Sequence, residues 1–387
     1  ARHPDWQQDT EIALGRLHVD GVPFELCARG RLQATVAAWQ ARGLTPKVGL
    51  ELEAYVFQQG VDGVWSPYDT PGAFVYGTGP QNDPAGLMNA LWATACDAGL
   101  HIESMNGEYD NGQFELTLQF DDALAACDAA FLFKTMAREV AADMDLLLTF
   151  LPKPIPDRGG SGMHVNFSFE DDSGANVIAP DGALSDVANG CMAGLIHHHE
   201  GLAGLLAMTV NSYDRLGPAS MAGYWANWAD DHRLVTTRSS VASPKSARLE
   251  HRMADCATNP YLAVTAVLQA ALLGVLQGLT EFLPVSSSAH LILGSQVFGW
   301  PDQGLVFDVA THLGTLFAVL FYFRRELLDM ARAWLGPVQN DTDRQHRAMV
   351  IYLGIASVPA LLVGFLAHDL VEFYLRDVRI IAWTTIG

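Results

Sequence analysis

The sequence predicts an α+β core, built as an antiparallel sheet with flanking helices, followed by an all-α transmembrane half-domain. Two observations separate these parts. Alternating, strand-like stretches with glycine-containing turns recur before residue 264, whereas long apolar stretches follow it. The chain has a formal net charge of −20, yet from Thr265 onward it has seven Arg against ten Asp or Glu, a net of only −3.

The length of 387 residues and this change in composition predict three segments: a short remnant at 1–46, an α+β domain at 47–266 and a membrane domain at 267–387. The acidic balance argues against nucleic acid as a partner, because phosphate neutralisation requires Lys and Arg. The five cysteines form no CxxC pair and favour a reduced, cytosolic compartment for the first part. Because the chain begins at Ala1, without a Met, we expect it to be a piece of a longer protein.

The stretch 47–57 alternates as a strand does. Glu51 and Glu53 fall on one of its faces, and three apolar side chains fall on the other. Two neighbouring carboxylates repel each other unless a cation lies between them. The pair therefore indicates either a metal site or a solvent-facing side of the sheet.

A hairpin is predicted around residues 110–112, because Glu108 ends one strand, these residues favour a turn, and Glu115 begins the returning strand. Both carboxylates can thus reach one place. Residues 121–149 follow with the apolar spacing of a helix. We expect its core side chains to be Leu124, Phe131, Met136, Val140, Met144 and Leu147.

Residues 159–162 read Gly-Gly-Ser-Gly and lead into a strand that opens with His164. Glycines let a backbone approach a ligand closely, so His164 is either a structural residue or a ligand in the same site. The run 197–199 consists of three histidines. Because consecutive helical residues point in different directions, we interpret it as a solvated helix surface rather than a metal site.

The stretch 245–252 predicts a strand on which Arg248, Glu250 and Arg252 share one face. A carboxylate between two guanidiniums suits either a solvent-facing strand or a cleft that holds a cation and polyanionic ligands. Guanidiniums suit carboxylate and phosphate oxygens because they present a planar fork of donors. Further well-spaced arginines are Arg215, Arg233 and Arg238.

In this order, these stretches resemble the catalytic domain of the glutamine synthetase family, including relatives that ligate glutamate to other amines. The resemblance covers residues 47–271. It implies two sites for Mg²⁺ or Mn²⁺, with ATP, glutamate and an amine as substrates. The metal ligands that it implies are Glu53, Glu108 and Glu115 for one ion, and Glu51, His164 and Glu250 for the other. The remaining residues that it implies are Arg233, Arg238, Lys245 and Arg248 at the ATP phosphates; Arg215 and Arg252 at the substrate carboxylate and transferred phosphoryl group; Gly160 in the glutamate loop; and Arg215, Arg233 and Arg252 as the catalytic arginines.

By this resemblance, the γ-phosphate moves to the glutamate side chain and an amine then displaces phosphate from the acyl-phosphate. Met221 stands where the family has the flap glutamate of the ammonium site, which favours a polyamine or monoamine acceptor, or a loss of activity. Gly159 likewise replaces the asparagine usual in the glutamate loop. The family forms homo-oligomers, but only the tail of its β-grasp domain fits before Lys47, and its carboxy-terminal segment is absent after about Ala271.

The second part predicts a membrane domain. The stretches 305–323 and 348–367 are each about as long as a bilayer span. A soluble pair of buried helices is the alternative. Five arginines lie between these stretches and place that connection on the cytoplasmic side; they are Arg324, Arg325, Arg332, Arg344 and Arg347.

Residues 277–290, together with Gly-Trp-Pro at 299–301, resemble undecaprenyl-diphosphate phosphatase, which recycles the lipid carrier of cell-wall synthesis. The resemblance covers about 268–387, the first half of that enzyme. It implies undecaprenyl diphosphate as substrate. The residues that it implies are Glu281 as an intramembrane acid, Ser286 and Ser287 at the phosphate, and His290 as acid, base or nucleophile.

The junction near residues 263–274 contains no Gly-, Ser- or Pro-rich linker. We therefore favour a chimera of a truncated glutamate–amine ligase, which works in nitrogen metabolism, and half a phosphatase, on the bacterial inner membrane with the ligase part in the cytoplasm. A working bifunctional enzyme is disfavoured, because the later Pro-Gly-x-Ser-Arg-Ser-Gly motif of the phosphatase family is missing. An inactive, membrane-tethered nucleotide-binding protein stands as a further alternative.

Overall fold

A computed structural model describes most of the first 282 residues and a few short stretches beyond them. The chain divides into two compact units, Ala1–Gly278 and Leu279–Gly387. The described residues are 6–7, 10–218, 220–282, 324–336, 343–344, 346–350 and 352.

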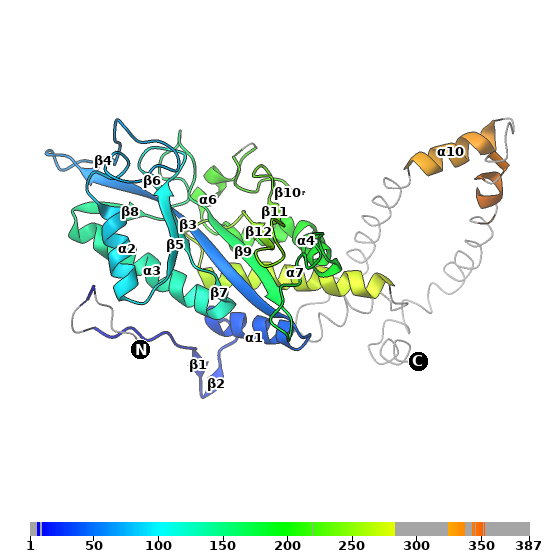
Figure 1. The fold of residues 1–387 in the computed structure, drawn as a ribbon, viewed down its shortest axis with the longest axis horizontal. Coiled ribbons are helices and arrows are strands. Elements are labelled where there is room, and N and C mark those ends of the chain that lie inside the picture. Colours follow the sequence, from blue (N-terminus) through cyan, green and yellow to red (C-terminus); the bar gives the residue numbers. More distant parts are fainter. Residues whose placement is uncertain are drawn as a thin grey trace. The chain divides into compact units, whose positions relative to one another are not determined.

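A ten-stranded sheet forms the framework of the first unit (Figure 1). Its main path runs β10-β11-β12-β9-β3-β6-β5, and β4, β7 and β8 pair with other parts of β3. All pairs are antiparallel except β10 with β11, which is parallel and departs from the predicted antiparallel sheet. The strands are β3 (Thr45–Gln59), β4 (Trp65–Pro67), β5 (Ile102–Gly107), β6 (Gln113–Leu118), β7 (Asp121–Asp122), β8 (Leu146–Thr149), β9 (Met163–Glu170), β10 (Trp228–Asp230), β11 (Thr237–Ser240) and β12 (Arg248–His251). A separate hairpin joins β1 (His18–Val19) to β2 (Val22–Pro23).

Strand β3 is the centre of this sheet, because both of its edges are paired along its length. Its alternation is the predicted one. Leu50, Leu52 and Ala54 are fully buried in the core beneath the sheet, so the glutamates between them are directed to the opposite face. The strand that carries the first two candidate ligands is therefore also the best-anchored strand of the unit.

Helices cover the core side of the sheet, where α1 and α3 pack on β3. Two helices begin with side-chain caps: Ser185 accepts from Ala188 N–H ahead of α4, and Thr209 forms a capping box ahead of α6. The helices are α1 (Ala28–Gln40), α2 (Leu87–Asp97), α3 (Ala123–Asp143), α4 (Asp186–His197), α5 (His199–Leu206), α6 (Val210–Arg215) and α7 (Pro260–Phe282).

The predicted helix over 121–149 is too long. Helix α3 ends at Asp143, Asp145 adopts a left-handed φ of 57°, and the chain continues as β8 against β3. Of the expected core side chains, Met136 is fully buried, whereas Leu147 is 44% exposed because it lies on the outer face of a strand. Phe131 is also exposed, and Val140 is buried.

Helix α7 belongs to the core of the first unit up to at least Val275, which is buried. Its backbone approaches α4 very closely, since a Cβ added to Gly194 would lie 2.1 Å from the Ala270 carbonyl oxygen. Trp39 Nε1 also donates to the Leu268 carbonyl oxygen over 3.1 Å. The predicted boundary at residues 266–267 stays a prediction.

In the second unit, the stretch expected as an arginine-rich connection contains helix α10 (Arg324–Leu335). Arg347 caps its end by donating to the carbonyl oxygens of Ala333 and Gly336 over 2.7 and 2.6 Å. Among the described residues, no helix combines the length and the apolar character that a membrane crossing requires. The predicted span 305–323 and most of 348–367 lie outside the described residues.

Candidate functional site

The antiparallel register of the sheet brings distant carboxylates together. Glu53 on β3 lies opposite Glu115 on β6, and Glu51 on β3 lies opposite His164 on β9. Strand β12 follows β9 in the sheet and adds Glu250. Candidate ligands that are up to about 200 residues apart in sequence thus lie on neighbouring strands.

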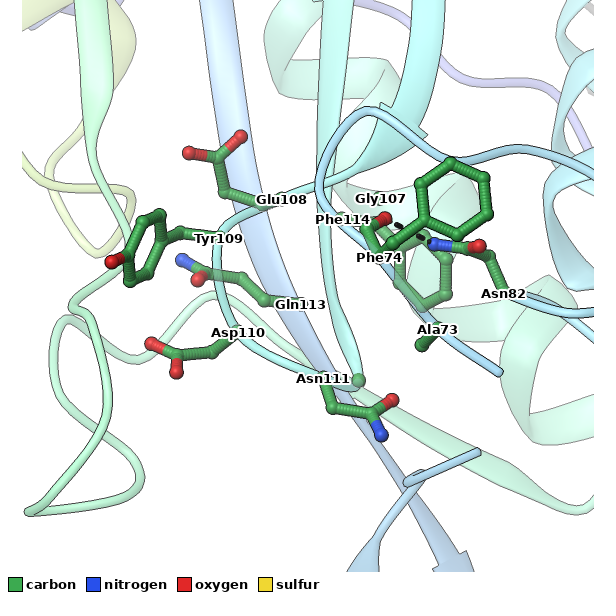
Figure 2. Close-up of a pocket in the computed structure, with 11 residues that line it drawn as sticks. Ala73, Phe74, Asn82, Gly107, Glu108, Tyr109, Asp110, Asn111, Gln113 and Phe114 are labelled. Atoms are coloured by element: carbon green, nitrogen blue, oxygen red, sulfur yellow. Dashed lines mark hydrogen bonds between the residues drawn. The ribbon is translucent and has the colours of Figure 1, made fainter. Parts of the chain in front are cut away.

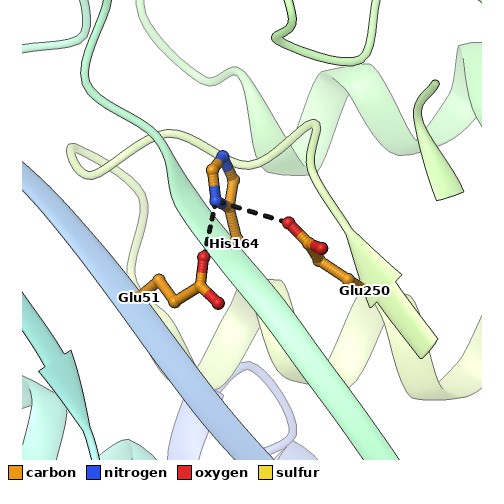
Figure 3. A group of neighbouring side chains, drawn as sticks. All are labelled: Glu51, His164 and Glu250. Carbon is orange, nitrogen blue, oxygen red and sulfur yellow. Dashed lines mark hydrogen bonds and ion pairs between the residues drawn. The ribbon is translucent and has the colours of Figure 1, made fainter. Parts of the chain in front are cut away.

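The first cluster consists of Glu51, His164 and Glu250, each of which offers a ligand atom within 4.8 Å of the other two (Figure 3). His164 Nδ1 lies 2.9 Å from Glu51 Oε2 and 3.6 Å from Glu250 Oε1. Asn166 Nδ2 donates to the second oxygen of Glu51 over 2.9 Å. Burial alone would raise the pKa of Glu51, but the hydrogen bond from His164 holds it at about 2.

The second cluster consists of Glu53, Glu108 and Glu115, each of which offers a carboxylate oxygen within 4.8 Å of the other two. Glu53 Oε1 lies 3.5 Å from His164 Nε2, so the clusters adjoin. Burial, reinforced by neighbouring glutamates, raises the pKa of Glu108 and of Glu115 to about 7. Glu108 Oε2 is also buried without a hydrogen-bond partner.

This donor set fits divalent cations. Five carboxylates meet one imidazole, and carboxylate oxygens are the ligands that Mg²⁺ and Mn²⁺ prefer. The charge of Glu108 raises the pKa of Glu115, and Glu108, which lies between β5 and β6 (Figure 2), leaves an acceptor oxygen without a hydrogen bond. A bound cation would satisfy that acceptor and remove the repulsion, and no other group of three such side chains is found in the described part of the chain.

The glycine loop, residues 159–162, lies against both clusters because its three glycines have no side chains to keep it away. A Cβ on Gly160 would lie 2.5 Å from Arg215 Cγ. A Cβ on Gly162 would lie 2.5 Å from Arg215 Nη2 and 2.9 Å from His164 Nε2. Gly162 N–H donates to Glu53 Oε2 over 2.7 Å, so the loop also orients a candidate ligand.

Buried arginines complete the site. Arg215 is only 4% exposed, and it donates to the backbone carbonyl oxygens of Met253 and Arg252 over 2.8 and 3.1 Å. Arg252 forms an ion pair with Glu250. The second cation beside Glu250 is Arg238, across the β11–β12 pair at 3.1 Å.

Arg248, expected beside Glu250, donates instead to Asn166 Oδ1 over 3.1 Å. Arg233 is exposed and contacts the hydroxyl of Tyr76 over 2.9 Å. Lys245 lies exposed in the connection between β11 and β12. The structure therefore gathers Arg215, Arg238 and Arg252 at the clusters and leaves Arg233 and Lys245 at the surface. The side chain of Glu281 and residues Ser286, Ser287 and His290 lie outside the described part.

Residues 25–291 match the family described as glutamine synthetase, catalytic domain. The chain belongs to the glutamine synthetase family. Residues 270–387 match a second family, described as bacitracin resistance protein BacA. Both resemblances seen in the sequence are thus confirmed, and the two matches overlap at residues 270–291.

The curated relatives of this glutamine synthetase-family chain include three amine ligases. It is 30% identical to glutamate–isopropylamine ligase of a Pseudomonas species, 32% to γ-glutamylethanolamide synthetase GlnA4 of Streptomyces coelicolor, and 31% to γ-glutamylputrescine synthetase PuuA of Escherichia coli. The alignments cover 74–77% of this chain but only 64–65% of the relatives. The chain therefore spans slightly less than two thirds of their length.

Solved structures agree on the fold. The chain matches GmaS in its ADP complex with a TM-score of 0.60 and 30% identity, over 68% of this chain and 62% of GmaS. It also matches Plasmodium falciparum glutamine synthetase with a TM-score of 0.60 and 21% identity, over 66% of this chain and 57% of that one. The first part thus has the mixed α+β fold of glutamine synthetase.

Sequence reasoning about this glutamine synthetase-family chain missed one site residue and misplaced one histidine. The missed residue is Asn166, which donates to Glu51 and accepts from Arg248. It lies two residues after His164 on the same strand, so the spacing alone could have placed it on the same face. The interpretation of 197–199 as a solvated surface is wrong for His199. That residue is 9% exposed, and its Nε2 contacts the Tyr224 carbonyl oxygen at 3.2 Å, because α4 ends at His197 and the chain turns inward.

Proposed function

We propose that the first unit is an ATP-dependent glutamate–amine ligase, which forms a γ-glutamyl amide through an acyl-phosphate. The observation that carries this proposal is the convergence of five glutamates and a histidine on two adjoining clusters beside a glycine loop. The printed names of the three curated relatives, each a glutamate–amine or γ-glutamyl amide ligase, support the reaction class.

Two divalent cations, Mg²⁺ or Mn²⁺, belong to this proposal. When bound, they would supply positive charge for the γ-phosphate and polarise the group that is transferred. One cation would be held by Glu51, His164 and Glu250, and the other by Glu53, Glu108 and Glu115.

The arginines would divide the remaining work. Arg238 and Arg248 lie on the neighbouring strands β11 and β12, where their guanidiniums suit the phosphates of ATP; Arg233 and Lys245 would reach the same phosphates from the surface. Arg215 and Arg252 are held in place by buried hydrogen bonds. Donors fixed before the reaction stabilise developing charge without reorganisation.

The reaction then follows from this arrangement. The side-chain carboxylate of glutamate attacks the γ-phosphorus of ATP, and ADP leaves. The acceptor amine next attacks the acyl carbon, loses a proton, and phosphate leaves as the amide forms. Gly160 would border the glutamate, because its lack of a side chain lets the loop pack on Arg215.

The acceptor is expected to be an organic amine. Met221 adopts a left-handed φ of 55°, is 40% exposed, and accepts from Arg252 Nε through its carbonyl oxygen over 3.3 Å. An apolar side chain is therefore fixed beside the buried arginine, at the place where resemblance expects an acid for ammonium. Thioether carbon surface suits the alkyl part of a monoamine or polyamine.

Phosphate release tests the proposal. Purified full chain with Mg²⁺, ATP and glutamate is expected to release phosphate with methylamine or putrescine more rapidly than with ammonium. Omitting glutamate should abolish the release. ATP binding without any amine- and glutamate-dependent release would instead identify an inert nucleotide-binding protein.

A second candidate function concerns residues 270–387, and the match to BacA is the observation that favours it. In it, undecaprenyl diphosphate would be the substrate, with Glu281, Ser286, Ser287 and His290 as predicted site residues. This region would attach the chain to the bacterial inner membrane, with the ligase part in the cytoplasm. Phosphate release from a C55 lipid diphosphate, measured with the purified full chain, tests this second function: release would support it and no release would contradict it.

A further inference from the structure

Two family matches share helix α7. The helix runs from Pro260 to Phe282, and the matches to the glutamine synthetase catalytic domain and to BacA overlap at residues 270–291. From residue 270 onward, α7 is therefore assigned to two different folds. One is the α+β core of the first unit, and the other is the predicted membrane domain.

Within the first unit, α7 is buried on every side. From Ala263 to Val275 no side chain is exposed, and only Gln269 and Leu273 are half-buried. The helix belongs to the same hydrophobic core as Trp39. Its large aliphatic side chains in that core are Val264, Val267, Leu268, Leu272 and Val275. Because a helix serves a second set of partners only through a free face, and this one has none over that range, the core of the first unit uses α7 completely.

The contact between α7 and α4 is closed at the level of the backbone (Figure 1). A Cβ on Gly274 would lie 2.2 Å from the Gly190 carbonyl oxygen, and a Cβ on Gly194 would lie 2.1 Å from the Ala270 carbonyl oxygen. Residues four apart share one face of a helix, so the two glycines of α4 meet Ala270 and Gly274 along a single line of contact. Only glycine allows so close an approach, and a second partner at this face would need the same space.

Helix α1 holds another part of α7 by hydrogen bonds. Trp39 Nε1 donates to the Leu268 carbonyl oxygen, and Gln269 Nε2 donates to Thr35 Oγ1, each over 3.1 Å. Trp39 is fully buried, so α7 can leave only if the core around this ring opens. Withdrawing five large aliphatic side chains would expose apolar surface whose burial is comparable with the whole stability of a typical domain. The loss of α7 would therefore unfold the first unit.

We propose that the two folds compete for α7 and that the first unit retains it. In a chain whose first unit is folded, residues 260–276 stay out of the bilayer, and any membrane-crossing segment begins after α7. Conversely, a membrane bundle that includes α7 forms only in a chain whose first unit is unfolded. The candidate phosphatase function would thus lack the helix that carries Glu281 whenever the ligase core is folded.

Hydrogen exchange of the purified full chain in lipid nanodiscs, measured over a series of urea concentrations, tests this proposal. The amides of residues 264–275 are compared with those of β3, which belongs to the first unit. We expect both sets to lose protection at the same urea concentration, because they open as one cooperative unit. A bilayer keeps water from the amides of a helix that crosses it. Protection of α7 that persisted after β3 had exchanged would therefore overturn the proposal.

Gly194→Ala disturbs the contact with α4 directly, because its Cβ would meet the Ala270 carbonyl oxygen. Exchange in both α7 and β3 should become roughly 10- to 100-fold faster, as expected for overpacking. Gly201→Ala in α5 is the matched control, since nothing lies within 4 Å of its Cβ, and its helix propensity should slow exchange slightly rather than accelerate it. A Gly194→Ala chain in which β3 alone exchanged faster, or in which neither did, would contradict the proposal. None of these rates depends on catalysis, so the test stands apart from both proposed activities.

Discussion

The two carboxylate clusters adjoin on one sheet, yet the protein compensates their charges differently. In the first cluster, Glu250 is 3% exposed and lies between the guanidiniums of Arg238 and Arg252. In the second, burial raises the pKa of both Glu108 and Glu115 to about 7, and Glu108 retains an unsatisfied oxygen. The comparison teaches that the protein itself compensates the charge of the first cluster, whereas it leaves the second cluster uncompensated, as the proposed cation would require.

Removing the charge of Glu250 should have the largest effect on stability. Glu250→Gln leaves the buried Arg252 without its counter-charge, whereas Arg238 keeps its ion pair with Asp231. Breaking a buried pair costs about 3–5 kcal/mol. Urea unfolding of the first unit, measured without divalent cations, gives this value. Glu25→Gln is the control, because Glu25 forms an exposed pair with Arg31 at 3.7 Å and should change stability by less than about 0.5 kcal/mol.

Removing a charge from the second cluster should stabilise the first unit instead of destabilising it, as long as no divalent cation is bound. Without divalent cations at about pH 8, Glu115→Gln relieves the repulsion by its neighbours and is expected to stabilise the first unit by roughly 1–3 kcal/mol. With excess Mg²⁺ the order should reverse, because the wild-type chain gains binding energy that the variant has lost. Thermal unfolding with EDTA and with Mg²⁺ measures both. If Glu115→Gln and Glu250→Gln destabilised the cation-free chain alike, the clusters would not differ as described.

The contact between the clusters can be broken at the glycine loop. A Cβ on Gly162 would lie 2.5 Å from Arg215 Nη2 and 2.9 Å from His164 Nε2. Gly162→Ala should therefore destabilise the unit by about 1–3 kcal/mol through overpacking, and Mg²⁺ should no longer stabilise it. Gly204→Ala in α5 is the matched control, since nothing lies within 4 Å of its Cβ, and it should stabilise slightly through helix propensity.

The residues of both clusters were predicted from the sequence, but one of their partners was not. The alternation in β3 placed Glu51 and Glu53 on one face, and the resemblance to the glutamine synthetase family supplied the full set of ligands. The partner Arg238 was missed at Glu250, because the register between β11 and β12 depends on tertiary packing that the sequence does not display.

The boundaries were less predictable for a similar reason. The apolar spacing after Ala123 continues past the end of α3, and only the left-handed conformation of Asp145 and the pairing of β8 with β3 end the helix. Tertiary pairing thus overrides a helical pattern where an edge of β3 is available. In the same way, the turn that buries His199 has no signal in a run of three identical residues.

The smallest expected effect on stability concerns His198, which lies in the turn between α4 and α5 and has no acidic partner. It can be compared with His164, which lies among glutamates. His164 has its pKa raised by Glu51 and Glu53 against the effect of burial, whereas burial and His197 lower the pKa of His198 to about 4. Below the ordinary histidine pKa of about 6.5, His198 binds a proton in the unfolded chain. In the folded chain it binds that proton only near pH 4. His198 therefore contributes nothing above that range and reduces stability as the pH falls through it. His198→Gln should lose about 1 kcal/mol less than the wild type between neutral pH and pH ~5 in urea titrations, a figure reduced for the partial exposure of the ring. An acid loss in His198→Gln equal to that of the wild type would show that the ring takes up its proton without opposing the fold.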